Sequence, residues 1–392
     1  MSDTRKTTKP NVPNLRFPGF EGEWEEYTMG EITELFSRRN KNRVDYPMFS
    51  VTNARGFVNQ QEQFEDREMK GEDIAAYKIV SPGEFAYNPA RINVGSIARY
   101  NGDKDCMISS LYVCFKAKKE LVDSQLLLHI LKSPKMVYSY RVNGEGGVRI
   151  YLFYPNFARI RVKLPCLEEQ RKIAPFLDLI EDRIQIQNKV IEDLKKLKTA
   201  FCEKMYDKSN PNTRLADIIE QQSIRNKAGE DLKVLSVSNR YGFVEQSEQF
   251  EDRTVASEDT SNYKIVALND FAYNPARINV GSIARLKNFE NGIVSPMYIC
   301  FRCKGSVLPE FLEPFFSTKY FSLEMGKRLE GSVRMCLSFE GLCNIPINIP
   351  SYEEQIETAK KVNALSDKLR LEESYSILLS AQKEYILSQM FI

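Results

Sequence analysis

The chain has 392 residues and a mass of 45.3 kDa, which exceeds one ordinary core and fits two or three domains of roughly 100 to 200 residues each. Hydrophobic residues make up 42% of the sequence and charged residues 28%, a composition that excludes disordered and collagen-like chains. Because no apolar run approaches the ~18 residues that cross a bilayer, we expect a cytoplasmic protein without a membrane partner. The 55 Lys and Arg nearly balance the 53 Asp and Glu, so attraction for a polyanion depends on local patches.

The histidine and cysteine residues offer few candidates for a catalytic or metal site. The one histidine, His129, lies in an apolar segment where a structural role is expected. Cys300 and Cys303 form a CxxC, and Cys336 with Cys343 would bring the number of thiol ligands to four. Residues three apart on a strand face opposite sides, however, and the first half of the chain has no counterpart of Cys303. We therefore expect reduced structural thiols and no metal site.

An internal repeat dominates the sequence. Ser50–Arg99 aligns without a gap on Ser236–Arg285, with 34 of 50 positions identical. Within these blocks, Phe85–Arg99 and Phe271–Arg285 are the same string, FAYNPARINVGSIAR. A period near 186 residues is far longer than a solenoid unit, so it indicates duplicated domains. Similarity fades over 101–147 and its counterpart, and returns before each long helix.

Each repeated unit is expected to mix helix and strand. Short apolar runs at 49–51, 79–80, 85–87 and 112–115, separated by Gly, Asn and Pro, predict strands. The pattern over 121–136 predicts a helix. Ser209, Asn210, Pro211 and Asn212 mark the linker before the second unit.

A long helix is predicted to close each unit. Apolar residues recur at spacings of three, four and seven from Glu168 to about Met205, and the second copy repeats this face. Gln187 and Glu372 are matched polar interruptions of the apolar face. About 40 residues at 1.5 Å each give a rod of roughly 60 Å. Pairing of the two helices is the favoured interpretation, and packing of each helix on its own unit is the alternative.

The two helices are expected to begin differently. Ser351 followed by Glu354 fits a capping box that starts the second helix after Pro350. The first helix lacks a capping hydroxyl and carries Pro175 in its first turns, so we expect a kink or a late start there.

The string Asn88-Pro89-Ala90 and its twin at 274–276 suggest one catalytic alternative. They resemble the NPP(F/Y/W) loop of amino methyltransferases, in which the Asn side chain and backbone carbonyls hold the target amine. The match is incomplete, because Ala replaces the second proline and Arg replaces the aromatic residue. The glycine-rich FPGFEG at Phe17–Gly22 does not follow an apolar strand, as a methyl-donor site would require. A stand-alone DNA adenine methyltransferase that uses these loops is the alternative function.

Repeated Arg, Lys and Asn residues favour binding of a polyanion. Arg39 and Lys41 recur as Arg225 and Lys227 in weakly matching surroundings, where they would clamp phosphates. Arg and Asn side chains of the identical string carry donors that pair with guanine or adenine edges in the major groove. The candidate DNA-contacting residues are Arg39, Lys41, Asn88, Arg91, Asn93, Arg99, Arg149, Arg225, Lys227, Asn274, Arg277, Asn279, Arg285 and Arg334. A solvated surface charge is the alternative for each single arginine.

The architecture and several strings together resemble a known family. Leu15–Trp24 reads LRFPGFEGEW, and the string EEQ occurs at Glu168–Gln170 and Glu353–Gln355. With the duplicated unit and the two helices, these strings resemble the specificity subunit of type I restriction-modification enzymes across essentially the whole chain. The resemblance implies an α+β fold with two similar α/β target recognition domains in a pseudo-twofold arrangement, joined by two long antiparallel helices that form a coiled coil. The implied segments are an N-terminal tail (1–22), recognition domain 1 (23–164), a central spacer helix (165–209), recognition domain 2 (210–349) and a C-terminal spacer helix (350–392).

The resemblance also implies a non-catalytic role on double-stranded DNA. Each recognition domain would read one half of a bipartite target, while the helices set the gap and dock two methyltransferase subunits. Two restriction and motor subunits would join for cleavage. No cofactor is expected in this chain, and S-adenosylmethionine, ATP and Mg are expected in the partner subunits. The residues expected to dock partner helices are Leu177, Ile180, Ile184, Ile191, Leu194, Val362, Leu365, Leu369 and Leu379.

The repeat adds an expectation about the target itself. If the block around Arg91 and Arg277 carries base readout, the two half sites share an inverted subsequence. If the divergent 101–147 segment and its counterpart carry it, the half sites are unrelated. A coiled-coil scaffold without a nucleic-acid role is the second alternative function.

Overall fold

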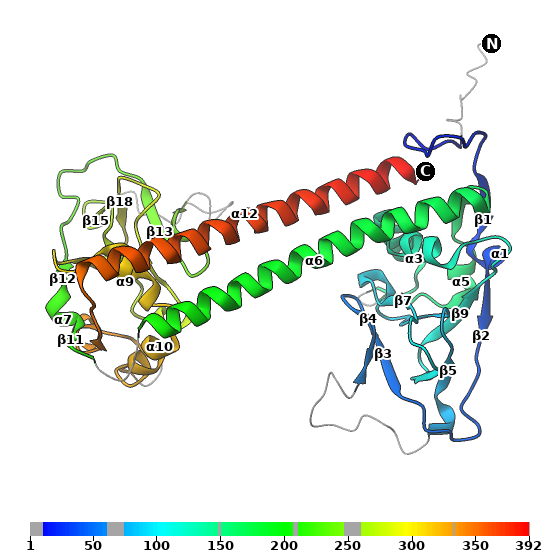
Figure 1. Ribbon diagram of the computed structural model, residues 1–392, viewed down its shortest axis with the longest axis horizontal. Helices are drawn as coiled ribbons and strands as arrows, with labels where there is room; N and C mark the ends of the chain where they lie inside the picture. The colour runs from blue at the N-terminus through cyan, green and yellow to red at the C-terminus, as the bar shows by residue number, and fades with distance from the viewer. Residues whose placement is uncertain are drawn as a thin grey trace, which may run out of the picture. The chain divides into compact units, whose positions relative to one another are not determined.

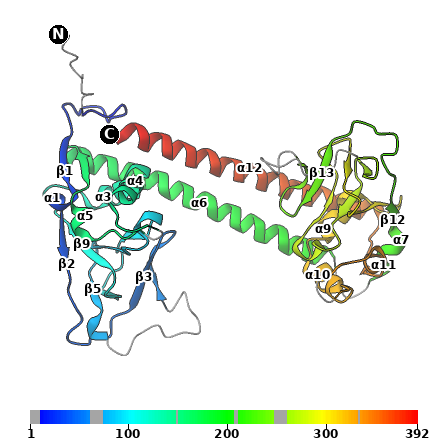
Figure 2. The same cartoon turned by 180° about the vertical axis from the view of Figure 1, so that it is seen from behind.

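The computed structural model describes residues 11–60, 74–147, 150–206, 211–246, 260–331 and 334–391. Its tertiary contacts divide the chain into two units, each of which holds one copy of the repeat (Figures 1 and 2). Unit 1 comprises Met1–Ile186 and Ser376–Ile392, and unit 2 comprises Gln187–Tyr375. The long helices α6 (Leu167–Met205) and α12 (Tyr352–Met390) have 39 residues each and contribute to both units. Within the described ranges, no helix is long and apolar enough to span a bilayer.

Unit 1 contains two four-stranded sheets, with strand orders β2-β9-β6-β7 and β4-β3-β8-β5, and β1 pairs with β10. Its strands are β1 (Glu25–Thr28), β2 (Thr33–Phe36), β3 (Met48–Thr52), β4 (Gly56–Asn59), β5 (Lys78–Val80), β6 (Phe85–Tyr87), β7 (Ile97–Arg99), β8 (Cys106–Ile108), β9 (Val113–Ala117) and β10 (Arg161–Leu164). Its shorter helices are α1 (Met29–Ile32), α3 (Ser124–Lys132), α4 (Pro134–Asn143) and α5 (Tyr154–Ala158), with 3-10 turns η1 (Ile74–Ala76) and η2 (Ile92–Val94).

Unit 2 repeats this topology strand for strand, with sheets β12-β19-β16-β17 and β14-β13-β18-β15 and the pair β11-β20. Its strands are β11 (Thr213–Arg214), β12 (Ile219–Gln222), β13 (Val234–Ser238), β14 (Gly242–Glu245), β15 (Lys264–Ala267), β16 (Phe271–Tyr273), β17 (Ile283–Arg285), β18 (Asn291–Val294), β19 (Ile299–Cys303) and β20 (Pro346–Ile347). Its shorter helices are α7 (Leu215–Ile218), α9 (Pro309–Phe315), α10 (Lys319–Gly326) and α11 (Phe339–Cys343), with the 3-10 turn η3 (Ile278–Val280). The prediction of two similar units of mixed helix and strand is confirmed.

The identical string has the same core role in both units. Phe85 on β6 lies opposite Phe115 on β9, and the rings stack with centroids 5.1 Å apart. Phe271 on β16 and Phe301 on β19 repeat the contact at 5.0 Å. All four side chains are fully buried. Each ring pair therefore anchors the strand from which the candidate site turn departs.

The helix predicted over 121–136 is two helices. α3 ends at Lys132, Ser133 caps α4 with its side chain, and Pro134 is the first residue of α4. Because proline has no backbone N–H to continue the hydrogen bonding of α3, the chain turns at Ser133. The sequence pattern located the helical region but not this break.

His129 lies on α3 against the start of α6. Its Nε2 is 2.8 Å from Oδ1 of Asp178, and Nε2 of Gln125 donates to the same oxygen at 2.8 Å. Burial lowers the pKa of His129 even though the Asp178 carboxylate acts to raise it. The histidine thus sits in a junction between two helices of unit 1, as a structural role requires.

The glutamine of each EEQ string fastens a long helix to its unit. The side chain of Gln170 accepts the N–H of Asp123 at 2.8 Å and donates to the carbonyl oxygens of Leu121 at 3.0 Å and Pro165 at 2.8 Å. Gln355 makes the equivalent three bonds in unit 2. The two residues are 1% and 2% exposed. EEQ is therefore a structural anchor in both copies.

The LRFPGFEGEW segment closes unit 1 against α6. Arg16 donates to both carboxylate oxygens of Glu169, at 2.9 and 2.7 Å, and this pairing raises the pKa of Arg16. Phe17 meets Phe176 edge to face at 5.6 Å, and Trp24 is 2% exposed. Within this unit the start of α6 lies beside the end of α12 in both views (Figures 1 and 2).

Pro175 does not delay the start of α6. The helix begins at Leu167 and continues through Pro175, so the expected late start is wrong. A proline inside a helix costs about 3 kcal/mol. Here Ile173, Ala174 and Leu177 are each 2% exposed or less, so the packing of this turn in the core of unit 1 offsets that cost.

Two other expectations for the helices are confirmed. The N–H and hydroxyl of Ser351 donate to Glu354 at 3.0 and 2.8 Å, and the N–H of Glu354 donates back at 3.4 Å, which is the predicted capping box. In unit 2, Nε2 of Gln187 donates to the carboxylate of Glu372 at 2.6 Å. The matched polar interruptions of the two helices therefore bond to each other.

Candidate nucleic-acid interface

The candidate base-reading residues lie on a turn that leaves the central strand of each unit. After β6 the side-chain oxygen of Asn88 accepts the N–H of Ala90 at 3.0 Å. Arg91 follows, and Gly95 ends the turn with φ of 94°. This left-handed backbone favours glycine, which explains its place in the string. Unit 2 repeats the turn after β16, and its closing glycine has φ of 87°.

In a methyltransferase loop, the Asn oxygen and a backbone carbonyl accept hydrogen bonds from the target amine. In this chain the equivalent oxygens already accept hydrogen bonds from the chain itself. The Asn88 oxygen is bonded within the turn, and the carbonyl oxygen of Pro89 accepts the N–H of Leu152 at 3.0 Å. In unit 2 the carbonyl oxygen of Pro275 accepts the N–H of Leu337 at 3.1 Å. The NPA strings therefore act as structural turns and ties.

In unit 2 the turn borders a cavity of about 630 Å³. Its lining includes Gln246, Asn274, Arg277, Met297, Tyr298 and Arg334. These residues come from β13–β14, from the turn after β16, and from the segments before β19 and α11. Three residues proposed from the sequence, Asn274, Arg277 and Arg334, thus meet at one site although they are far apart in the chain.

This cavity offers many hydrogen-bond donors. Among the described residues that line it there is no Asp or Glu, and nothing in the described ranges pairs with the exposed guanidinium groups of Arg277 and Arg334. The side-chain oxygen of Asn274 accepts the N–H of Ala276 at 3.1 Å, while its NH₂ lies 3.9 Å from the weakly accepting sulfur of Met297. The site therefore suits a ligand group rich in acceptors.

Gln246 and its counterpart Gln60 are site residues that sequence reasoning missed. The side-chain oxygen of each is buried and has no hydrogen-bond partner in the described part of the chain. An unpaired buried acceptor costs about 1–3 kcal/mol, so its recurrence at equivalent positions is notable. Identity of the two glutamines within the aligned block was the available signal.

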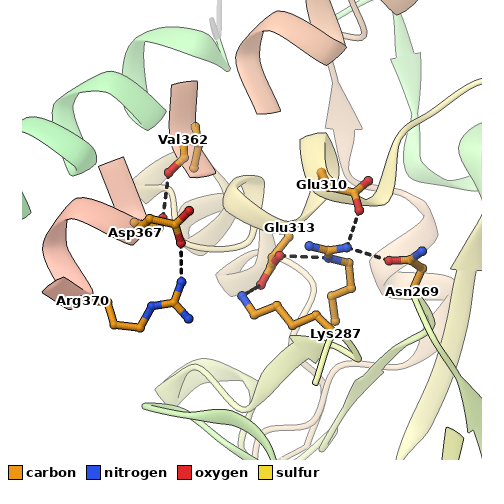
Figure 3. Close-up of polar contacts among 9 residues, drawn as sticks. Asn269, Lys287, Glu310, Glu313, Val362, Asp367 and Arg370 are labelled. Carbon is orange, nitrogen blue, oxygen red and sulfur yellow. Dashed lines mark hydrogen bonds and ion pairs between the residues drawn. The ribbon is translucent and has the colours of Figure 1, made fainter. Parts of the chain in front are cut away.

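Arg285 makes structural contacts within unit 2, so its guanidinium is already engaged in the free protein. It is 7% exposed. Its Nη1 donates to Glu310 and Asn269 at 2.6 Å each, and its Nε donates to Glu313 at 2.9 Å (Figure 3). These acceptors hold its guanidinium inside unit 2. The counterpart Arg99 is half-buried and donates to a glutamine of α3.

The Arg-Asn-Lys strings form a second pair of equivalent turns. Asn40 is 1% exposed, and its side chain accepts the N–H of Val44 at 3.0 Å and donates to the Val44 carbonyl at 2.7 Å. Asn226 makes the equivalent bonds in unit 2. These turns leave four cations on the surface: Arg39, Lys41, Arg225 and Lys227.

The remaining candidates occupy varied positions. Arg91 is exposed at the start of η2, like its counterpart Arg277 at η3. Asn93 is half-buried, and Asn279 is exposed. Arg149 lies outside the described residues.

The residues expected to dock partner helices are covered within the chain. Leu177, Ile191, Val362 and Leu379 are 2%, 9%, 4% and 4% exposed, and Ile180, Ile184, Leu194, Leu365 and Leu369 are half-buried. The first four therefore offer little surface to a partner helix in this structure. The apolar face read from the sequence is the inward face of the helices.

Other apolar side chains of the helices in unit 1 are exposed. Leu179 and Ile186 on α6 are 69% and 65% exposed, and Leu378 and Tyr385 on α12 are 66% and 65% exposed. Each pair is separated by seven residues, about two helical turns, and therefore lies on one face of its helix.

The CxxC thiols are poor metal ligands. Burial raises the pKa of Cys300 and of Cys303 to about 12, so both remain protonated near neutral pH. Metal binding requires the thiolate. Across the described ranges, no group of three or more His, Cys, Asp or Glu is placed to hold a metal ion.

Residues 21–196 match the family model for the type I restriction modification DNA specificity domain. Over these residues the chain is therefore similar to the DNA specificity domain of type I restriction-modification systems. The match spans the first copy of the repeat, and the second copy has the same strand order.

Proteins named as type I specificity subunits match between 58% and 93% of this chain. The MjaX specificity subunit of a type I restriction enzyme from Methanocaldococcus jannaschii is 21% identical, over 93% of this chain and 92% of that protein. The HindI specificity subunit from Haemophilus influenzae is 20% identical, over 58% of this chain and 52% of that protein. Among solved structures, the type I restriction-modification S subunit from M. genitalium aligns with a TM-score of 0.59 at 14% identity, over 97% of this chain and 99% of that one, which shows a shared fold.

Proposed function

We propose that this chain is the DNA-recognition subunit of a type I restriction-modification complex, with each unit reading one half of a bipartite target. The donor-rich cavity at the turn of unit 2, with Arg277 and Arg334 unopposed by carboxylates among the described residues, carries this proposal. Phosphate contacts from the exposed Arg39 and Arg225 turns supply the sequence-independent part of binding. Equivalent turns in both units supply one reading site for each half site.

The chain itself is non-catalytic in this proposal. S-adenosylmethionine, ATP and Mg belong to the partner subunits: two methyltransferase subunits that modify adenine, and two restriction and motor subunits that join for cleavage. The engaged acceptors of the Asn88 and Asn274 turns support this division, because neither turn offers the groups that hold a target amine.

The two long helices set the gap between the half sites and dock the methyltransferase subunits. Support for docking comes from the exposed apolar faces at Leu179 and Ile186 and at Leu378 and Tyr385. An apolar helix of a partner packed on these faces would remove them from water, at roughly 25 cal/mol per Å² buried.

Binding and methyl transfer by defined assemblies test the proposal. The chain purified with its methyltransferase subunits is expected to bind duplex DNA and to methylate adenine, while the purified chain alone transfers no methyl group from S-adenosylmethionine. Methyl transfer by the chain alone would instead support the methyltransferase alternative. An assembled complex that ignores DNA would support the scaffold alternative.

Copurification tests the docking faces. Leu378→Glu places a charge on the exposed face of α12 and is expected to abolish recovery of the methyltransferase subunit with this chain. Ser380→Glu, at an exposed position about 200° around the same helix from Leu378, is the matched control and is expected to preserve recovery. Equal recovery with both variants would move the docking surface elsewhere.

A shortened helix tests the spacer role. Deleting one heptad from α6 alone is expected to shorten the gap between half sites or to abolish assembly. A full-activity complex with an unchanged gap would contradict that role.

A further inference from the structure

We infer that the cavity of unit 2 and the equivalent turn of unit 1 each select a guanine in the DNA major groove, through Arg277 and Arg91. The inference rests on the proposed function, because it names the base that these same sites read. The two arginines hold equivalent positions before η3 and η2, and both are exposed. Within the ranges that the structure describes, no acidic group pairs with either guanidinium.

The first step is the balance of donors and acceptors at the cavity. The Asn274 oxygen is committed to Ala276, which leaves the NH₂ of this side chain facing sulfur. Arg277 and Arg334 add charged donors, so donors outnumber the one buried side-chain acceptor of the lining that has no partner among the described residues, the side-chain oxygen of Gln246. A DNA group that fits must present acceptors. Guanine presents O6 and N7 on its major-groove edge, in a geometry that an arginine fork matches, and the phosphate oxygens are the other acceptor-rich group of DNA.

Second, apolar side chains beside the arginine favour guanine over phosphate as the group that is bound. Val280 ends the 3-10 turn η3 that begins directly after Arg277, and it is 54% exposed. Met297 lines the cavity and is 60% exposed. Their counterparts in unit 1, Val94 and Leu111, are 50% and 79% exposed. Exposed apolar side chains beside an arginine suit base edges and thymine methyl groups, whereas a phosphate requires a polar, hydrated neighbourhood.

The third step is the repetition of the lining. At the positions of the first copy equivalent to those that line the cavity, two residues differ: Phe49 stands for Leu235, and Leu111 stands for Met297. Every polar position keeps its residue type. Both half sites should therefore contain the guanine. The two half sites should differ at the base pairs next to it.

Selection of duplex DNA from a random-sequence library tests the inference. The probe is bound by the full chain assembled with its methyltransferase subunits, and the bound sequences are compared for the unchanged protein and four variants. Arg277→Ala is expected to lower the preference for guanine roughly 10- to 100-fold at one position of one half site. Arg91→Ala is expected to do so in the other half site. Arg214→Ala, at an exposed arginine of unit 2 outside the cavity, is expected to leave the motif intact.

Arg277→Lys distinguishes a base from a phosphate. Lysine keeps the positive charge but loses the planar fork, so guanine preference should fall while affinity for unrelated DNA stays. If Arg277 instead contacts a phosphate, the Arg277→Lys variant should bind DNA nearly as tightly as the unchanged protein. With a phosphate contact, Arg277→Ala would also lower the binding affinity equally for all DNA sequences. The slope of the logarithm of the binding constant against the logarithm of the salt concentration would fall in magnitude by about 1.

The outcomes separate this inference from the proposed function. If the unchanged complex selects a bipartite motif and Arg277→Ala leaves every guanine preference in place, the inference is overturned and the proposed function stands. The uniform, sequence-blind loss also overturns it. If the unchanged complex selects no sequence, the proposed function fails and the inference falls with it. Arg277 makes no side-chain bond within the described residues, so folding of the variants is expected and is checked by circular dichroism.

Discussion

Arg99 and Arg285 end the same 15-residue string in the two units, yet they have different surroundings. Arg285 is held by Glu310 and Glu313 of α9 at 2.6 and 2.9 Å and is 7% exposed. Arg99 is half-buried and donates to Gln125 of α3. The strand, the turn and the closing glycine are alike in both copies. An identical string therefore determines its own backbone, while its side-chain partners come from the helices that diverge.

This comparison separates shared features from copy-specific ones. The glutamine anchors and the donor-bearing turns are shared, and the Arg285 network and His129 belong to one copy each. The chain has a single tryptophan, Trp24, in unit 1. Its fluorescence therefore reports unfolding of unit 1, while circular dichroism reports both units.

Truncating a glutamine anchor is expected to have the largest effect on stability. Gln170→Ala leaves one N–H and two carbonyl groups without their partner, and should lower the free energy of unfolding of unit 1 by about 3 kcal/mol. Gln355→Ala should do the same to unit 2. Gln185→Ala, at an exposed position of α6, should change it by less than about 0.5 kcal/mol. Urea unfolding, followed by Trp24 fluorescence and by circular dichroism, measures these changes. Unequal losses of unfolding free energy for Gln170→Ala and Gln355→Ala would show that the two anchors are not equivalent.

The next effect concerns the two arginines. Arg285→Met leaves Glu310 and Glu313 without their cation and should cost unit 2 about 2 kcal/mol, because the two carboxylates are still 33% and 28% exposed. Arg99→Met should cost unit 1 about 1 kcal/mol, since it loses one hydrogen bond. The same urea experiment ranks them. Equal losses of unfolding free energy for Arg285→Met and Arg99→Met would show that the diverged helices do not determine how much this arginine contributes to stability.

A smaller effect of opposite sign is expected at the unpaired glutamines. Gln246→Met keeps the length of the side chain and removes a buried acceptor that has no partner among the described residues, so unit 2 should gain about 1 kcal/mol. Gln60→Met should stabilise unit 1 by a similar amount. Thermal unfolding checks both. A loss of stability would mean that the amide is bonded in the free protein.

The smallest effect is a pH dependence confined to unit 1. Burial lowers the pKa of His129, so the unfolded chain binds more protons than the folded one between the lowered value and the ordinary value near 6.5. Stability contributed by the neutral imidazole is therefore present above this window and is lost as the pH falls through it. Asp178 and Glu181 oppose the shift, and Lys383 adds to it. We expect the stability of unit 1, read from Trp24, to fall as the pH is lowered below the ordinary histidine pKa near 6.5.

His129→Gln is the matched variant for this effect, since it retains a side-chain amide that can bond to Asp178. It should reduce the fall in stability of unit 1 and leave unit 2 unchanged. An identical pH slope in the variant and the unchanged protein would assign the dependence to other groups.

Features carried by nearby residues were predictable from the sequence. The duplicated units, the short strands at 85–87 and 112–115, and the cap formed by Ser351 and Glu354 all depend on local patterns. The matched positions of Gln187 and Glu372 in the apolar pattern were also visible, whereas their hydrogen bond is known only from the structure. The local cost of Pro175 predicts a late helix start, but its buried neighbours offset that cost in the folded chain.

Features that depend on distant segments were not predictable. The meeting of Arg277 with Arg334 requires the tertiary packing of unit 2, and the acceptors around Arg285 lie on a helix that has no close match in the first copy. The apolar helix face was read correctly as a pattern, but the sequence could not say whether the chain or a partner covers it. Burial of Val362 and Leu379 decides this in favour of the chain.

Mapping of methylated adenines by single-molecule sequencing, on DNA from cells that contain the assembled complex, tests the central claim most directly. The account predicts a bipartite motif whose two halves share an inverted subsequence that includes a guanine, separated by a fixed gap. A motif with wholly unrelated halves would contradict it and assign readout to the divergent segments.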